Sequence, residues 1–465
     1  MSISPGYQLQ GTLKFTPHSP QNPSCWSLSR KIPIALVALF TVMNSGLSAS
    51  LPSNAIPYLR PEFHLSDGPQ TSLPTSLFLV GYTVGPLVFS PLSETVGRRL
   101  VLLSTFGVFV LSTLGCALAP NWPVLLVFRF LCGSMGSAPQ TVVGGIYADL
   151  FEERRSRGRA MLLYMSASSF GPILGPIISG FASPHNWRWT FWIELIFAGC
   201  TFVGLVFVPE TFAPVLLKRE ATRLRSQGLD VSLAQEKMDM VRILQRPLAM
   251  LVLEPIISCT ALFIALAYSF VFFYLQAYPI IFGGVYHLSI QTTSLAFLPV
   301  GIGASSTAFS ALAYDTYYER AKKAGQQWTN SPELHRLPIS CIGGIGLTVS
   351  LLWLAWSSRP SIPWALPMSS GLLFGFAYQT IFISLLTYVT DAYTIYSASA
   401  LASSVILRSL LGAVFPLAVR PMYNAWGVAW ATSFVGLLSL LCVPIPFGLI
   451  AFGKRIRERS RYRCV

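Results

Sequence analysis

The sequence predicts an all-α membrane protein with twelve transmembrane helices in two six-helix halves. Apolar residues make up 53% of the 465 residues and charged residues only 11%, whereas a soluble domain carries about 25% charged residues. This composition excludes a soluble globular protein, and it also excludes a disordered chain. Twelve apolar runs are long enough to cross a bilayer as helices, and the basic residues are distributed in step with them.

The apolar runs form two sets of six, separated by a long polar stretch. They fall at 33–53, 72–92, 100–119, 123–147, 160–182 and 189–208, and then at 249–274, 290–313, 338–356, 362–386, 397–418 and 427–452. We therefore expect five segments: a tail 1–32, a half 33–208, a linker 209–248 with short surface helices, a half 249–452 and a tail 453–465. Six plus six is typical of transporters built from repeated halves.

The basic residues predict the orientation of the chain. With both termini cytoplasmic, 26 of the 32 Lys and Arg residues lie in cytoplasmic segments and four in outer segments. This is the positive-inside pattern, and a missed helix would scramble it. The pattern also accounts for the net charge of +14, so we expect no nucleic-acid partner. Only Arg129 and Arg408 lie inside the spans.

Several kinds of site are missing from the sequence. All five histidines fall in tails or loops, and the eight cysteines form no C-x-x-C pair. No Walker A motif and no G-x-S-x-G motif occurs. The pair Gly301 and Gly303 is weakly similar to a dinucleotide motif, but helix packing explains it better. We expect no metal, no cofactor and no enzyme activity.

The segment GPLVFSPLSETVGRR, residues 85–99, lies at the cytoplasmic end of the second span. Here the chain resembles the major facilitator superfamily, whose signature loop follows G-x-x-x-[DE]-x-x-G-[RK]-[RK]. The resemblance implies a cytoplasmic latch on the outward-facing state, in which the acidic residue faces the eleventh span and the first Arg pairs with an acid ending the fourth. The residues concerned are Glu94, Gly97, Arg98, Arg99 and Asp149. The alternative is a simple positive-inside anchor.

Arg129 lies well inside the fourth span. A charged side chain there is costly unless it is paired or hydrated. The resemblance implies that Arg129 takes part in proton coupling. The alternative is that its side chain extends about two turns to the outer interface.

The fifth span contains GPILGPIISGF, with Gly171, Pro172, Gly175, Pro176 and Gly180. Gly and Pro recur at i and i+4, so one helix face is smooth and the helix can bend. The segment resembles the motif that distinguishes antiporters from symporters. A packing role is also expected, and the two interpretations are compatible.

Further stretches narrow the resemblance to the fungal drug:proton antiporter branch with twelve spans, from about residue 22 onward. They include NPSCWSLSRK (22–31), PETFAPVLLKREATRLR (209–225), TYVTDAY (387–393) and SASALASSVILRSLLGAVFPL (397–417). The resemblance implies a monomer in the plasma membrane, with the vacuolar membrane as alternative, that exports a small, mostly apolar organic compound in exchange for protons. An importer on the same fold and a non-transporting sensor are the rivals.

Polar residues inside the spans are candidates for coupling and for the substrate pathway: Asn44, Arg129, Glu194, Glu254 and Arg408. Burial favours the protonated form of a carboxyl group, so Glu194 or Glu254 could carry the proton. In the alternatives, Glu194 pairs with a basic group and Glu254 lies at the linker interface. We expect Asp391 to be a gate or a cap, and Arg408 to pair across the bundle.

Aromatic and amide side chains cluster in and after the seventh span and in the tenth. They are Phe270, Phe272, Phe273, Tyr274, Gln276, Tyr278, Tyr378 and Gln379. They either line an apolar cavity suited to flat substrates or pack against lipid, which is the more common arrangement.

Overall fold

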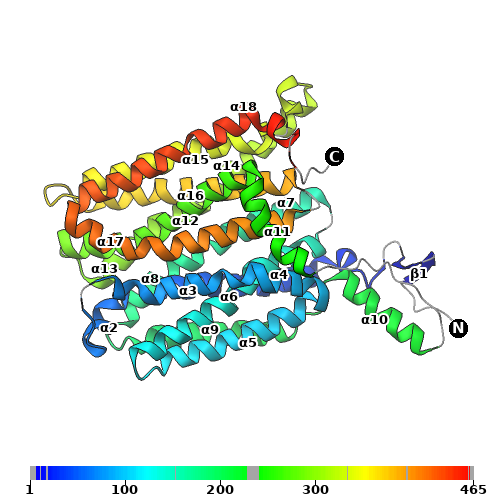
Figure 1. Cartoon of the computed structure of the whole chain (residues 1–465), viewed down its shortest axis with the longest axis horizontal. Helices are drawn as coiled ribbons and strands as arrows, with labels where there is room; N and C mark the ends of the chain where they lie inside the picture. The colour runs from blue at the N-terminus through cyan, green and yellow to red at the C-terminus, as the bar shows by residue number, and fades with distance from the viewer. Residues whose placement is uncertain are drawn as a thin grey trace.

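The computed structural model describes residues 7–10, 12–16, 19–66, 68–151, 153–227, 240–331, 333–393, 396–458 and 460. The middle of the predicted linker, 228–239, and the outer parts of both predicted tails, 1–6 and 461–465, lie outside the described residues. The described chain is almost entirely helical, as predicted. Figure 1 shows the first half, in blue and cyan, beside the second half, in green to red.

The first half contains six crossings that run alternately in opposite directions. They are α1 (Leu28–Ser50), α3 (Leu73–Tyr82) with α4 (Val84–Val96), α5 (Arg98–Ala117), α6 (Trp122–Leu150), α7 (Arg154–Ser168) with α8 (Phe170–Ala182), and α9 (Arg188–Val206). Between the first two crossings lie η2 (Leu51–Asn54), α2 (Ile56–Glu62) and η3 (Pro69–Ser72). The second and fifth crossings are interrupted just before a Gly-Pro pair, because proline removes a helical hydrogen bond and bends the helix.

The second half repeats this layout. Its crossings are α12 (Pro255–Tyr278) with η4 (Pro279–Val285), α13 (Ile290–Leu295) with α14 (Leu298–Lys323), α15 (Glu333–Ser357), α16 (Ala365–Ala392), and α17 (Ser397–Cys442) with α18 (Pro444–Glu458). A short helix η5 (Gln327–Asn330) precedes α15. Gly427 divides α17 with φ 71° and ψ 173°, a left-handed conformation that favours glycine. Two crossings therefore meet at Gly427.

Hydropathy supports the twelve crossings. Ten helical segments of the described chain are long and apolar enough to span a membrane, and one of them, Ser399–Glu458, contains the last two crossings. The remaining crossing is the fourth, α6. Its mean hydropathy is lower than that of the other crossings because it carries Arg129, Gln140 and several Gly and Ser residues. Many of those residues are buried inside the first half, so they do not face lipid.

Within each half, the second and fourth crossings of that half approach each other closely at glycine residues. A Cβ atom on Gly133 of α6 would lie 1.9 Å from the carbonyl oxygen of Phe78 on α3. In the second half, a Cβ on Gly303 of α14 or on Gly375 of α16 would lie 2.0 or 1.9 Å from a backbone carbonyl oxygen of the other helix. Such close approach requires residues without a side chain. Helix packing is thus the role of Gly303.

The seventh crossing differs from the prediction at its N-terminal end. The predicted span 249–274 is one helix, but the structure divides it between α11 (Met240–Leu253) and α12. Glu254 lies between them with φ −106° and ψ 104°, outside the helical region, at the N-cap position of α12. The cause is Pro255, which disfavours helical backbone in the residue before it.

The N-terminal tail contains a hairpin that we did not expect. Strands β1 (Tyr7–Gln10) and β2 (Thr12–Phe15) pair antiparallel, with Tyr7 opposite Phe15 and Leu9 opposite Leu13. The alternating pattern on both sides of a glycine is a hairpin signal, but it is too short to stand out in a polar tail. Strand β2 packs against the linker helix α10 (Ala213–Ser226), which projects from one end of the bundle (Figure 1).

Candidate functional site

Arg129 is fully buried in the first half. Its guanidinium donates hydrogen bonds to the carbonyl oxygen of Ser48 (2.7 Å), to the Ser48 hydroxyl (3.1 Å) and to the carbonyl oxygen of Pro74 (3.1 Å). Its Cζ lies 4.7 Å from the centre of the Phe78 ring. The alternative in which Arg129 reaches the outer interface is therefore wrong, and this one side chain joins α6 to α1 and α3.

Two more predicted residues lie near Arg129. Glu194 on α9 is 1% exposed, and its carboxylate lies near the Ser48 hydroxyl. Its charge interacts with that of Arg129. Asn44 lies one turn from Ser48 on α1 and donates from Nδ2 to Thr201 Oγ1 on α9 (2.9 Å). We call Asn44, Ser48, Arg129 and Glu194 the buried polar cluster.

The glycines of the fifth crossing bring α8 against α1. A Cβ on Gly171 would lie 2.7 Å from the carbonyl oxygen of Met43, and one on Gly175 would lie 2.1 Å from Ser50 Oγ. Pro172 fits in turn against Gly46, where a Cβ would lie 2.9 Å from the Pro172 ring. The expected packing role is thus seen in the structure, while the antiporter role stays a prediction.

The end of the bundle opposite β1, which the sequence predicts to be the outer end, joins the two halves. A Cβ on Gly180 would lie 1.7 Å from Ser294 Oγ on α13. The Asn54 amide donates to the same Ser294 oxygen (2.7 Å) and to the carbonyl oxygen of Pro176 (3.0 Å). Helix α3 also packs along α17 of the second half. The halves therefore meet closely where the fifth and eighth crossings have their outer ends.

At the opposite end, which the sequence predicts to be cytoplasmic, the pair implied by the resemblance is present. Arg98 Nε lies 3.5 Å from Asp149 Oδ2. The Arg98 guanidinium also donates to Ser93 Oγ (2.7 Å) and lies over the ring of Phe212 at 4.7 Å. Arg98 is 8% exposed. These contacts tie the second, third and fourth crossings together, while a latch function stays a prediction.

Glu210 is a residue of this region that the sequence analysis missed. Its buried carboxylate accepts the backbone N–H groups of Arg98 (3.0 Å) and Arg99 (3.2 Å), and so caps the first turn of α5. Gly97 has φ 113°, and a Cβ there would lie 2.4 Å from Glu210 Oε2. The available signal was an acid in the segment PETFAP, directly after the sixth crossing.

Replacing this cap is expected to destabilise the protein. Glu210→Ala leaves the first N–H groups of α5 without an acceptor, which should cost about 1–2 kcal/mol. The measurement is the thermal unfolding midpoint of purified protein in detergent. Glu62→Ala is the control, because Glu62 forms an exposed pair with Arg188 (3.4 Å) that contributes about 0–1 kcal/mol. Equal midpoints for the two variants would contradict the capping role.

Glu94 lies half-buried on α4. It forms no hydrogen bond or ion pair with the residues that the structure describes. Helix α4 packs against α17, the helix that begins at Ser397. The arrangement is compatible with the predicted position of Glu94 near the start of the eleventh crossing, and its role stays a prediction.

The second half contains a matching charge pair. Arg336, at the start of α15, lies 3.5 Å from Asp391 Oδ2 near the end of α16, and 3.2 Å from Asp315 Oδ1 on α14. Arg98 and Asp149 occupy the corresponding positions in the first half. Asp391 is exposed, and its role as a cap or gate stays a prediction.

Glu254 lies away from the buried polar cluster, in the other half. It is 1% exposed and accepts a hydrogen bond from the Tyr393 hydroxyl (2.9 Å). It therefore connects the start of α12 to the residue that follows α16. This position, next to the helix that continues from the linker, favours the alternative of a structural contact over that of a proton carrier.

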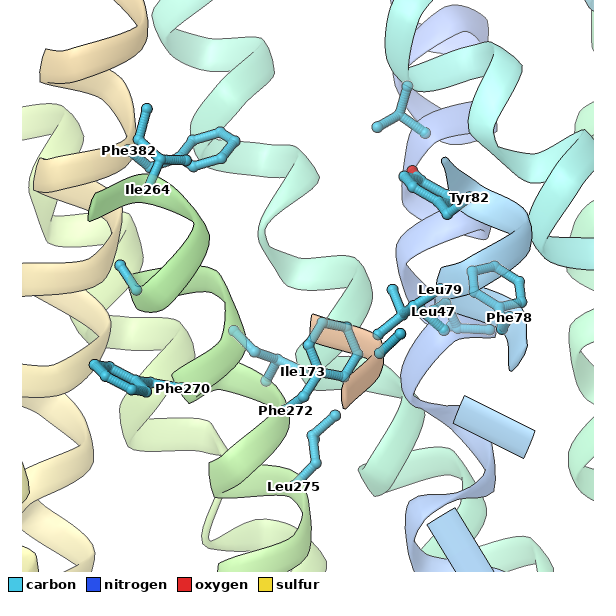
Figure 2. Close-up of a cluster of buried hydrophobic side chains, with 14 of the residues drawn as sticks. Leu47, Phe78, Leu79, Tyr82, Ile173, Ile264, Phe270, Phe272, Leu275 and Phe382 are labelled. Carbon is cyan, nitrogen blue, oxygen red and sulfur yellow. The ribbon is translucent and has the colours of Figure 1, made fainter. Parts of the chain in front are cut away.

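The aromatic cluster lies inside the protein, so the lipid-facing alternative is wrong. The fully or nearly fully buried members are Phe270, Phe272, Phe273, Tyr274, Gln276, Tyr278 and Gln379. Figure 2 shows the second-half side chains Ile264, Phe270, Phe272, Leu275 and Phe382 on one side, with the first-half side chains Leu47, Phe78, Leu79 and Tyr82 across from them. Gln379 joins the halves, because its Nε2 donates to the carbonyl oxygen of Met165 (3.0 Å).

Arg408 on α17 is buried at 2% exposure. Its Cζ lies 5.1 Å from the ring centres of both Tyr268 and Phe382. It forms no ion pair with a described residue, so the expected pairing across the bundle is wrong. Its neighbours are aromatic rings of its own half.

Residues 38–416 match the family model described as Major Facilitator Superfamily. The chain belongs to the major facilitator superfamily. A solved superfamily member, the proton:xylose symporter XylE from E. coli, superposes with a TM-score of 0.67 at 18% identity, covering 92% of this chain and 96% of that one. This similarity shows the fold, and it accounts for the two repeated six-helix halves described above.

Two curated members of the superfamily are similar over most of their length. The multidrug transporter mdrA of Aspergillus fumigatus is 35% identical, over 96% of this chain and 74% of that protein. The efflux pump MFS2 of Trichophyton rubrum is 35% identical, over 97% of this chain and 77% of that protein. This superfamily member is therefore a multi-pass membrane protein of a transporter family, with fungal efflux proteins among its relatives.

Proposed function

We propose that this protein exports a small, mostly apolar organic compound in exchange for protons. The observation that carries the proposal is Glu194, a carboxyl group that is 1% exposed, lies near the Ser48 hydroxyl and interacts with the charge of the buried Arg129. The efflux names of the relatives support the direction of transport. Export of this kind requires no cofactor and no enzyme activity.

The buried polar cluster suits a group that gains and loses a proton. An ionised Glu194 is attracted to the Arg129 guanidinium, and this attraction is strong where water is excluded. A protonated Glu194 is neutral and loses most of that attraction. Protonation therefore changes the interaction of α9 with α6 and α1, and can bias the protein between two conformations.

The two halves, 33–208 and 249–452, are the units that we propose to move about a central substrate site. The pairs Arg98–Asp149 and Arg336–Asp391 would form at the cytoplasmic side when the protein faces outward, with Glu94 nearby. The Gly and Pro residues of α8 would allow its close contact with α1 and α13 at the outer side. We propose a monomer in the plasma membrane with cytoplasmic termini.

Glu194→Gln tests the coupling. The protein is produced in a pump-deficient yeast, and the accumulation of fluorescent and antifungal compounds is measured with and without a protonophore. The wild-type protein should lower accumulation only while the proton gradient exists. We expect Glu194→Gln to reduce gradient-driven efflux at least about tenfold, because the amide cannot ionise. The matched control is Glu62→Gln, an exposed acid at the outer surface.

Two outcomes would contradict the proposal. Efflux that survives the protonophore, or that is unchanged in Glu194→Gln, would remove the coupling role of this carboxyl group. Gradient-dependent accumulation in place of expulsion would establish the alternative of an importer on the same fold.

A further inference from the structure

The guanidinium of Arg408 has no acceptor in the part of the chain that the structure describes. Its Nε is buried without a hydrogen-bond partner, and no described residue accepts a hydrogen bond from any of its nitrogens. An arginine carries five N–H donors and is always charged. A buried cation without a hydrogen-bonded counter-charge is strongly unfavourable. A bound anion that accepts hydrogen bonds from Arg408 would remove this cost.

The two aromatic rings beside Arg408 are its described neighbours, and neither can replace a carboxylate as a hydrogen-bond acceptor. Tyr268 of α12 and Phe382 of α16 each lie 5.1 Å from its Cζ. An aromatic face attracts a cation but accepts no in-plane N–H bond of the kind that a carboxylate accepts. The N–H groups of Arg408 are therefore without a hydrogen-bond acceptor among the described residues.

Arg408 belongs to the surface of the second half that faces the first half. One turn along α17, a Cβ on Gly412 would lie 3.3 Å from Tyr268 and 3.4 Å from Leu79 of α3. The charge of Arg408 acts on the phenol groups of Tyr82 and Tyr164 in the first half. In Figure 2, Phe382 and Tyr82 lie on facing sides of the two halves.

We propose that Arg408 binds the carboxylate of an aromatic or otherwise flat organic anion, and that such anions are the substrate class of this protein. The inference rests on the proposed function, which it narrows from apolar compounds in general to monoanions with an apolar body. The guanidinium edge holds the carboxylate, and the rings of Tyr268, Phe382 and Tyr82 surround the apolar part. Because Arg408 is a single positive charge among neutral side chains, we expect it to bind a ligand with one negative charge.

A binding experiment on the full chain tests the inference without transport. The purified protein is placed in nanodiscs of phosphatidylcholine, and binding of 2-naphthoate is compared with that of 2-naphthamide, which has the same ring system but no charge. We expect the carboxylate to bind about 10- to 100-fold more tightly, since a charge-assisted bidentate pair replaces a neutral contact. Inorganic phosphate and phosphatidylglycerol nanodiscs test whether a free inorganic anion or a lipid headgroup competes.

Variants connect the preference to Arg408. Arg408→Gln should bind the carboxylate and the amide equally, with the affinity for the amide unchanged. The control Arg188→Gln removes a half-buried arginine that lies away from Arg408, at the end of the bundle predicted to be outer, and should keep the wild-type preference. Arg408→Lys provides a second variant if Arg408→Gln fails to fold, and should bind the carboxylate less tightly than the wild type, because an ammonium cannot form the bidentate pair.

Three results would overturn the inference: equal binding of the two probes by the wild type, a preference retained in Arg408→Gln, or displacement of naphthoate by phosphate or by anionic lipid at similar concentrations. Its failure differs from that of the proposed function. Gradient-driven efflux of neutral compounds without a carboxylate preference would remove only the inference. A carboxylate preference that depends on Arg408, in a protein whose efflux ignores the proton gradient, would remove only the coupling.

Discussion

Arg129→Ala is expected to abolish efflux. The guanidinium makes three hydrogen bonds to α1 and α3 and lies over the Phe78 ring. Each hydrogen bond to a charged group contributes about 1.5–3 kcal/mol. The substitution also removes the positive charge that favours an ionised Glu194, so the buried carboxyl group would stay protonated and could not exchange its proton. We expect the efflux rate per folded transporter to fall at least about tenfold.

Arg129→Lys separates charge from geometry. A lysine keeps the positive charge but cannot donate to both oxygens of Ser48 and to Pro74 from a planar fork. If charge alone matters, the lysine variant should restore efflux. We expect it to remain mostly inactive, because the hydrogen bonds also position α1 and α3. Wild-type activity in Arg129→Ala, at equal amounts of folded protein, would exclude Arg129 from the mechanism.

The fold could be predicted because the bilayer imposes simple rules on the sequence. A crossing needs about 20 apolar residues, and basic residues mark the cytoplasmic ends. These rules predict α5 or α15 to within a few residues. They do not show where a helix breaks, because a break depends on local backbone chemistry, as at Glu254 before Pro255. They also miss the hairpin β1–β2, whose pairing is not a membrane signal.

The sequence identified most of the residues of the candidate site, but it did not identify the groups that they contact. Charges inside spans are rare, so Arg129, Glu194 and Arg408 stand out in the sequence. Their partners are mostly backbone oxygens, hydroxyls or aromatic rings, which carry no distinctive sequence signal. Arg129 bonds to Ser48 and Pro74, and Arg408 lies between rings instead of beside an acid. Glu210 was missed for the same reason, because it binds backbone N–H groups.

Gly133→Ala is expected to cause the largest loss of stability from a single methyl group. Gly133 of α6 lies directly against α3, and the added Cβ would be 1.9 Å from the carbonyl oxygen of Phe78 and within 3 Å of two more backbone atoms of that residue. Backbone cannot rotate away as a side chain can, so α3 must shift. Overpacking costs about 1–3 kcal/mol, and we expect about 3 kcal/mol here. The readouts are the yield of monodisperse protein and the thermal unfolding midpoint.

Gly144→Ala provides the matched control on the same helix. The nearest atom to its added Cβ is the Met161 methyl at 4.0 Å, an ordinary contact with a flexible side chain. Replacing a helical glycine by alanine without strain stabilises by about 0.4–1 kcal/mol, so the control should unfold at the wild-type temperature or slightly above it. If Gly133→Ala matched it, α3 and α6 would have to be farther apart in the membrane than the backbone contact at Phe78 requires. Gly375 makes the same kind of contact inside the second half, where its added Cβ would lie 1.9 Å from the carbonyl oxygen of Val300. Gly375→Ala should therefore show a similar loss if the helices within each half pack by the same rule.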